Sequence, residues 1–139
     1  MREILFRGKV AGGDWVYGFP FINEEEGITR SCEKEWRFPV HYILENENKI
    51  GMRRHVVILE TISQYIGMND IKGNKIFEGD VVKAKDLYQE LFVIEYGDYS
   101  FGLHDGKNGV VGEWVDYDEL EIIGNIFDNP ELLGVKLYR

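Results

Sequence analysis

The chain has 139 residues, of which 44% are hydrophobic and 29% are charged, and its formal net charge is −9. Its one cysteine, Cys32, excludes an internal disulfide and fits a reducing cytoplasm, and no segment reaches the roughly 18 apolar residues of a membrane span. The acidic balance repels phosphate backbones, which disfavours nonspecific binding to nucleic acid. These totals favour a soluble cytoplasmic protein with one domain, or with two small β modules that share a core.

Two aromatic stripes dominate the first half of the chain, after a strand candidate at residues 3–7. Alternate residues are apolar in each stripe, which is the pattern of a half-buried strand, so we expect these side chains in the core. An aromatic face left uncovered would contact protein, including a second copy of this chain. Pro20 and Pro39 have no N–H to donate, so each strand is expected to lie at a sheet edge or to end there. The stripes consist of Trp15, Tyr17, Phe19 and Phe21, and of Trp36, Phe38, Val40, Tyr42 and Leu44.

The rest of the first half is predicted to form two loops and a buried strand. Residues 24–27 and 45–49 are charged or polar, as in loops. The run Val56–Leu59 is continuously apolar, as in a strand buried on both faces, and it is short enough to form a helix turn instead. The composition then changes. We therefore expect an N-terminal β half, residues 1–62, and a C-terminal barrel-like half, residues 63–139, with one shared core as the alternative.

The second half opens with a turn-rich stretch, residues 64–82, in which Gly, Asn and Asp separate short apolar segments. Asn108-Gly109 predicts a hairpin, and Asp128–Gly134 predicts one helical turn, because a capping residue and Pro130 precede an acidic first turn. Short strands at about ten-residue spacing are typical of a small barrel or sandwich. We expect them at residues 81–84, 91–96, 100–104, 113–115 and 120–126. The predicted fold class is mainly β, with small barrel-like or sandwich-like β units and a short C-terminal helical turn.

Three blocks of sequence resemble the YopX family of phage and prophage proteins. They are Arg2-Glu3-Ile4 with Phe6-Arg7, the stretch from Gln64-Tyr65 to Gly79-Asp80-Val81-Val82, and Ile122–Phe127 running into Asn129-Pro130-Glu131-Leu132-Leu133. The blocks stand in the family's order, whereas residues 8–55 match loosely, and Ile66 occupies a position where threonine is expected. The resemblance implies a mainly β, bacteriophage-encoded protein that works in the cytoplasm of the host bacterium. It brings no known reaction or catalytic residue set.

No stretch has the spacing of a catalytic, cofactor or metal site, so none is predicted. A calcium-binding loop with Gly73 at its sixth position would place Lys72 where an oxygen ligand is needed. Gly106-Lys107 lacks the Ser or Thr that follows in a phosphate-binding loop. Cys32 has no second cysteine nearby, and the three histidines are scattered without a zinc-ligand spacing: His41, His55 and His104.

Three hypotheses about function follow. The leading one is a non-catalytic protein-binding module that self-associates and engages a protein partner, such as a host factor, through its acidic second half. The first alternative is a single-stranded nucleic-acid-binding β-barrel, in which arginines stand beside aromatics that stack on bases. The second is a cryptic enzyme whose pocket joins Cys32 to a histidine. The acidic surface consists of Asp116, Asp118, Glu119 and Glu121, and the alternative nucleic-acid surface of Arg37, Arg53 and Arg54.

Overall fold

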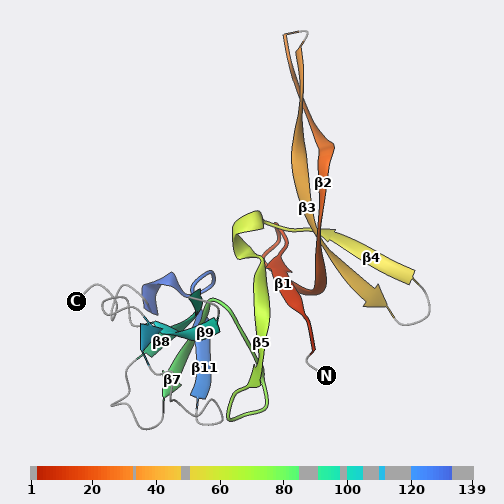
Figure 1. Ribbon diagram of the computed structural model, residues 1–139. Helices are drawn as coiled ribbons and strands as arrows, with labels where there is room; N and C mark the ends of the chain where they lie inside the picture. Colours follow the sequence, from red (N-terminus) through yellow and green to blue (C-terminus); the bar gives the residue numbers. More distant parts are fainter. Residues whose placement is uncertain are drawn as a thin grey trace. The chain divides into compact units, whose positions relative to one another are not determined.

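The computed structural model describes residues 3–32, 34–47, 51–84, 91–97, 100–104, 110–111 and 120–132, and its regular structure is almost entirely antiparallel strand (Figure 1). The chain divides into two compact units, which we call the N unit, Leu5–Ser63, and the C unit, Gln64–Arg139 with Met1–Ile4. The prediction of a mainly β fold is confirmed. Among the described strands, the sheets are open rather than closed into barrels.

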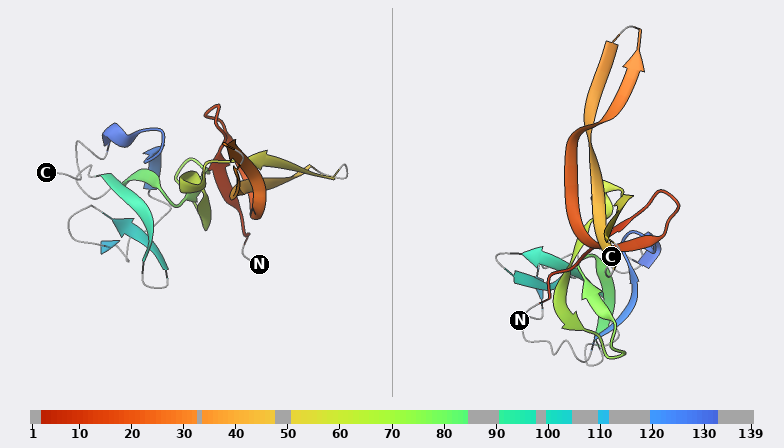
Figure 2. Two further views of the ribbon diagram at one scale, coloured as in Figure 1. Left: turned by 90° about the horizontal axis from the view of Figure 1, so that it is seen from above. Right: turned by 90° about the vertical axis from the view of Figure 1, so that its right-hand side faces the viewer.

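The N unit is an antiparallel meander in which each strand pairs with the next along the chain. The register pairs β1 with β2 only as far as Gly18, and β4 with β3 only as far as Tyr42. Beyond these points, β2 and β3 pair only with each other among the described strands of this unit. They form a two-stranded ribbon, residues 19–31 with 34–41, which we call the arm (Figures 1 and 2). The elements are β1 Phe6–Lys9, β2 Trp15–Ser31, β3 Lys34–Glu47, β4 Gly51–Val56 and the 3-10 turn η1 Leu59–Thr61.

The strand β2 is longer than the sequence predicts. Pro20 lies inside β2, so the expectation that the strand can end there is wrong, but the open edge beyond Gly18 is where a residue without an N–H is tolerated. The charged loop expected at residues 24–27 is instead an irregularity within the strand, because the register with β3 shifts between Asn23 and Gly27. Four residues on β2 there span the same distance as two on β3.

The strand predicted for the apolar run Val56–Leu59 is wrong. The strand β4 ends at Val56, and only Val57 is buried, whereas Val56, Ile58 and Leu59 are about half exposed. Hydrogen bonds to β1 explain the break, because Ile58 N donates to Lys9 O at 2.9 Å and Lys9 N donates to Thr61 Oγ1 at 2.9 Å. These bonds hold the chain in a 3-10 turn where the apolar run suggests a strand.

The C unit combines a hairpin, β5–β6, with a five-stranded antiparallel sheet in the order β10-β9-β8-β7-β11. Its core is apolar and fully enclosed, which is the burial that stabilises a small β domain. The core side chains are Ile66, Ile76, Val82, Phe92, Ile94 and Leu120. The strands are β5 Ser63–Asn69, β6 Lys75–Phe77, β7 Asp80–Ala84, β8 Leu91–Gly97, β9 Ser100–His104, β10 Val110–Val111 and β11 Leu120–Asn125. The strands predicted at residues 81–84, 91–96, 100–104 and 120–126 are therefore confirmed.

The predicted C-terminal helical turn is also confirmed, and it begins at Pro130. Asn125 anchors it, since its Oδ1 accepts hydrogen bonds from the backbone N–H groups of Phe127 and Asp128. The Asn108-Gly109 hairpin and the strand predicted at residues 113–115 lie outside the described residues. Within the residues that are described, no helix is both long and apolar enough to cross a membrane.

Candidate functional site

The pairing of β2 with β3 brings the two aromatic stripes of the sequence onto one face of the sheet. Phe19 is directly opposite Leu44, and Phe21 is directly opposite Tyr42. Directly paired residues of antiparallel strands project to the same side, so every second residue along both strands joins this face. We call it the aromatic face. It consists of Tyr17, Phe19, Phe21, Trp36, Phe38, Val40 and Tyr42, together with Val56 of β4.

Most of the aromatic face is exposed, which corrects the prediction that these stripes lie in the core. Trp36 is 50% exposed and Phe21 is 45% exposed, and Tyr17, Phe19, Phe38 and Val56 fall in the same range, whereas Tyr42 is buried. The described residues of the N unit form strands of one sheet and a single 3-10 turn, so none of them supplies a second layer over the face. Alternation along the strands predicts the stripes correctly, but not whether anything covers them.

Contacts at the base of the arm hold the aromatic face in place. The ring centroids of Phe21 and Tyr42 are 6.3 Å apart, and the Arg54 guanidinium lies 5.0 Å above the Tyr42 ring. Glu26, from the irregular part of β2, forms an ion pair with Arg54 at 3.4 Å. A hydrogen bond with the Glu26 carboxylate raises the pKa of the Tyr42 hydroxyl, and burial adds to this effect.

Two glycines allow the close approach that this face requires. A Cβ atom on Gly27 would lie 2.2 Å from the Phe38 ring, so the ring covers the bare backbone of the facing strand. A Cβ atom on Gly18 would lie 1.9 Å from the backbone oxygen of Leu44. A residue larger than glycine at either position would therefore displace β3 or its side chains.

The opposite face of the arm has a different character, because charged side chains predominate toward its tip. Arg30 and Arg37 both contact the Glu35 carboxylate, at 3.1 Å and 3.4 Å. Two isoleucines, Ile22 and Ile28, are exposed on this face to the same degree as the aromatics on the other. The arm therefore offers one aromatic side and one charged side.

The three arginines of the predicted nucleic-acid surface do not gather beside the aromatics. Arg54 pairs with Leu44 and lies on the aromatic face, where it contacts Glu26. Arg37 and Arg53 pair with Ile28 and Glu45, and this register places both on the opposite face. Of the acidic surface, only Glu121 is described, and it forms an ion pair with Lys72 at 2.9 Å. Asp116, Asp118 and Glu119 lie outside the described residues.

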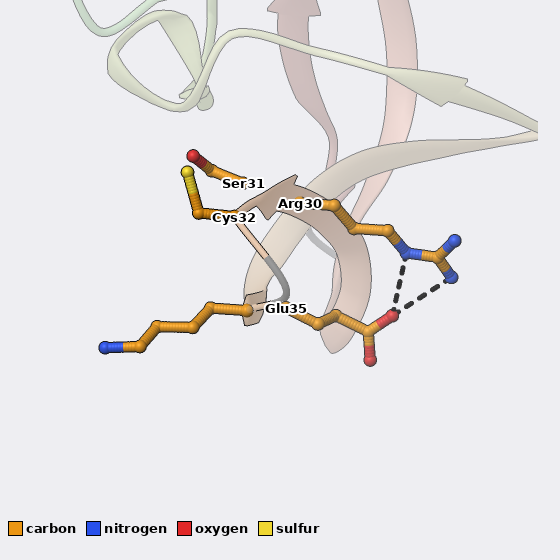
Figure 3. Close-up of a pocket in the computed structure, with 5 residues that line it drawn as sticks. Arg30, Ser31, Cys32 and Glu35 are labelled. Atoms are coloured by element: carbon orange, nitrogen blue, oxygen red, sulfur yellow. Dashed lines mark hydrogen bonds and ion pairs between the residues drawn. The ribbon is translucent and has the colours of Figure 1, made fainter.

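A shallow hollow of about 370 Å³ lies at the arm tip, lined by Arg30, Ser31, Cys32, Lys34 and Glu35. Figure 3 shows the Ser31 hydroxyl and the Cys32 thiol on one side of the turn and the Arg30–Glu35 pair on the other. No described lining residue is a histidine, and His55 is hydrogen-bonded to Glu45 at 2.8 Å. Among the described residues, the hollow therefore does not bring Cys32 together with a histidine.

A second hollow, of about 280 Å³, lies in the C unit between Glu78, Glu95 and apolar side chains that include Phe127. Burial raises the pKa of the Glu78 carboxyl, and the charge of Glu95 raises it further. Over the described part of the chain, no group of three or more His, Cys, Asp or Glu side chains could hold a metal ion.

The aspartates of the turn-rich stretch stabilise backbone. Asp70 is buried, and its Oδ1 accepts from the N–H groups of Lys72 and Asn74, while its Oδ2 accepts from Ile122 N–H on β11. Burial raises the pKa of this carboxyl, but the hydrogen bonds from these N–H groups outweigh burial, so the net pKa is lowered. Asp80 Oδ2 accepts from Phe77 N–H at 2.7 Å. Asp70 and Asp80 belong to the second block that resembles the YopX family, and their hydrogen bonds therefore stabilise the backbone of the C unit.

Comparison with known proteins agrees with this reading of the fold. The crystal structure of protein EF1440 from Enterococcus faecalis superposes with a TM-score of 0.51 at 17% sequence identity, over 96% of this chain and 99% of that one. At this identity the likeness concerns the fold alone. No curated protein matches the chain. The family described as YopX protein matches residues 20–134, and this chain belongs to the YopX family.

Proposed function

We propose that the chain is a phage or prophage protein that acts in the cytoplasm of the host bacterium as a non-catalytic protein-binding module, and that the aromatic face is its binding surface. The observation that carries this proposal is the half exposure of large aromatic side chains on one side of the arm. Contiguous exposed apolar surface marks sites of interaction, and aromatic residues are enriched at the centres of protein interfaces.

The arrangement of charge favours a protein partner over a nucleic acid. Binding of single strands requires cations beside the stacking rings. Only one arginine of the predicted set, Arg54, lies on the aromatic face, and it is paired with Glu26. The net charge of −9 also opposes phosphate. The acidic residues Asp116, Asp118, Glu119 and Glu121 remain a second proposed contact surface for a host factor.

The test compares two double variants of the arm with matched exposure. Phe21→Ser with Trp36→Ser, the aromatic pair variant, removes side chains from the aromatic face, and Ile22→Ser with Ile28→Ser, the isoleucine pair variant, does so on the opposite face. Each protein is immobilised and used to capture proteins from host-cell lysate with and without nuclease. We expect nuclease-resistant capture by the wild type and the isoleucine pair variant, and its loss in the aromatic pair variant. Recovery of nucleic acid alone would refute the proposal.

A further inference from the structure

We propose that the partner on the aromatic face is a second copy of this chain, and that two arms pack aromatic face to aromatic face about a two-fold axis. This inference rests on the proposed function, because it names the partner of the same surface. It follows from the isolation of the arm and from the apolar area that the arm exposes.

The arm is a hairpin over which the described residues of its own unit place no supporting layer. Beyond Gly18 and Tyr42, the register leaves β2 and β3 paired only with each other among the described strands of the N unit. A two-stranded hairpin alone is marginally stable in water and needs further strands or a packed face. A second arm laid on the aromatic face would supply that layer, as in a β-sandwich whose two sheets contribute equally to the core.

The exposed area suits a dimer of ordinary size. Large aromatic side chains bury about 150–250 Å² each when fully covered. Tyr17, Phe19, Phe21, Trp36 and Phe38 are between 44% and 50% exposed, so the aromatic face presents about 500 Å² per copy. Two copies would cover about 1,000 Å², which reaches the size expected of a specific interface.

Sedimentation velocity over a series of protein concentrations tests this inference directly. We expect the wild type to show a concentration-dependent dimer, the aromatic pair variant to dissociate at least about tenfold more readily, and the isoleucine pair variant to behave as the wild type. Far-UV circular dichroism of each variant controls for folding. A wild type that stays monomeric at every concentration would overturn the inference, as would equal dimer loss in both variants.

The same variants separate this inference from the proposed function. A monomeric wild type whose aromatic pair variant still loses a captured protein would end the inference and leave the binding-module proposal standing. If the aromatic pair variant changes neither sedimentation nor capture, both fail.

Discussion

The core of the C unit and the arm of the N unit are both built from antiparallel strands, yet the apolar side chains are buried in the core and about half exposed on the arm. In the C unit, Ile76, Ile94 and Leu120 are completely buried. On the arm, Phe21 and Trp36 keep about half of their surface in contact with solvent. Alternation therefore specifies which face is apolar, while burial depends on a second layer that only one of the two regions possesses.

Polar side chains also differ between the two regions, in how far along the chain their contacts reach. In the C unit, the Asp70 carboxylate connects the turn after β5 to Ile122 on β11, 52 residues away. On the arm, Glu35 contacts Arg30 and Arg37, which are at most five residues away along the chain. The Asp70 contact in the C unit is thus long-range, whereas the Glu35 contacts near the tip of the arm are local.

The largest effect is expected in the enclosed core. Leu120→Ala should lower the free energy of unfolding by about 2–5 kcal/mol, because it leaves a cavity among fully buried side chains. Trp36→Ala, measured by urea unfolding at a concentration too low for association, should cost under about 1 kcal/mol, because the side chain is half exposed. Equal costs at the two sites would contradict the contrast between the regions.

The next effect should come from the base of the arm. Gly18→Ala forces a Cβ atom against the Leu44 backbone and should cost about 2–3 kcal/mol, by the penalty for overpacking. Gly27→Ala meets only the Phe38 ring, which can rotate away, and should cost about 1 kcal/mol. Urea unfolding followed by tryptophan fluorescence measures both. A larger cost for Gly27→Ala than for Gly18→Ala would mean that the backbone of β3 is displaced more easily than the Phe38 ring.

Acid should reveal the contribution of Asp70. Because its folded pKa lies below its ordinary value of 3.8, its stabilisation is complete above the unfolded pKa and is lost as pH falls through the lower folded pKa. Asp70→Asn turns an amide toward Ile122 N–H and should cost about 1–3 kcal/mol at neutral pH. Unfolding measured across the acid range should show this difference shrinking at low pH. A difference that stays constant would assign the stabilisation to another group.

The smallest change in stability is expected at Glu26. Glu26→Gln removes a partly exposed ion pair with Arg54 and should change the free energy of unfolding by under about 1 kcal/mol. It should also lower the pKa of Tyr42 toward 10.0, which ultraviolet titration of the tyrosines can follow. Tyr42 titrating as in the wild type would mean that Glu26 does not act on its hydroxyl.

The local elements of the fold could be predicted from the sequence because they depend on local chemistry. Short runs of strand-forming residues at about ten-residue spacing identified β7, β8 and β11. The irregularity between Asn23 and Gly27 escaped prediction, because a run of glutamates has the composition of a loop and only the partner strand shows that pairing resumes.

The aromatic face could be predicted only in part. Both stripes are visible as alternating residues, but whether they share one face depends on the register of β2 and β3. A shift of one residue would place them on opposite sides. Their exposure depends on how many layers the unit has, which alternation does not encode. The positions of Arg37 and Arg53 behind the aromatics follow from the same register.

The two prolines of the arm limit how copies of this chain can accumulate. Pro20 lies in β2 and Pro39 in β3, so each strand of the ribbon has one position that cannot donate to a neighbouring strand. Growth by edge-to-edge strand addition, the route to fibrils, needs an uninterrupted row of donors along an open edge. The arm can be covered from its aromatic side but is poorly suited to sideways extension.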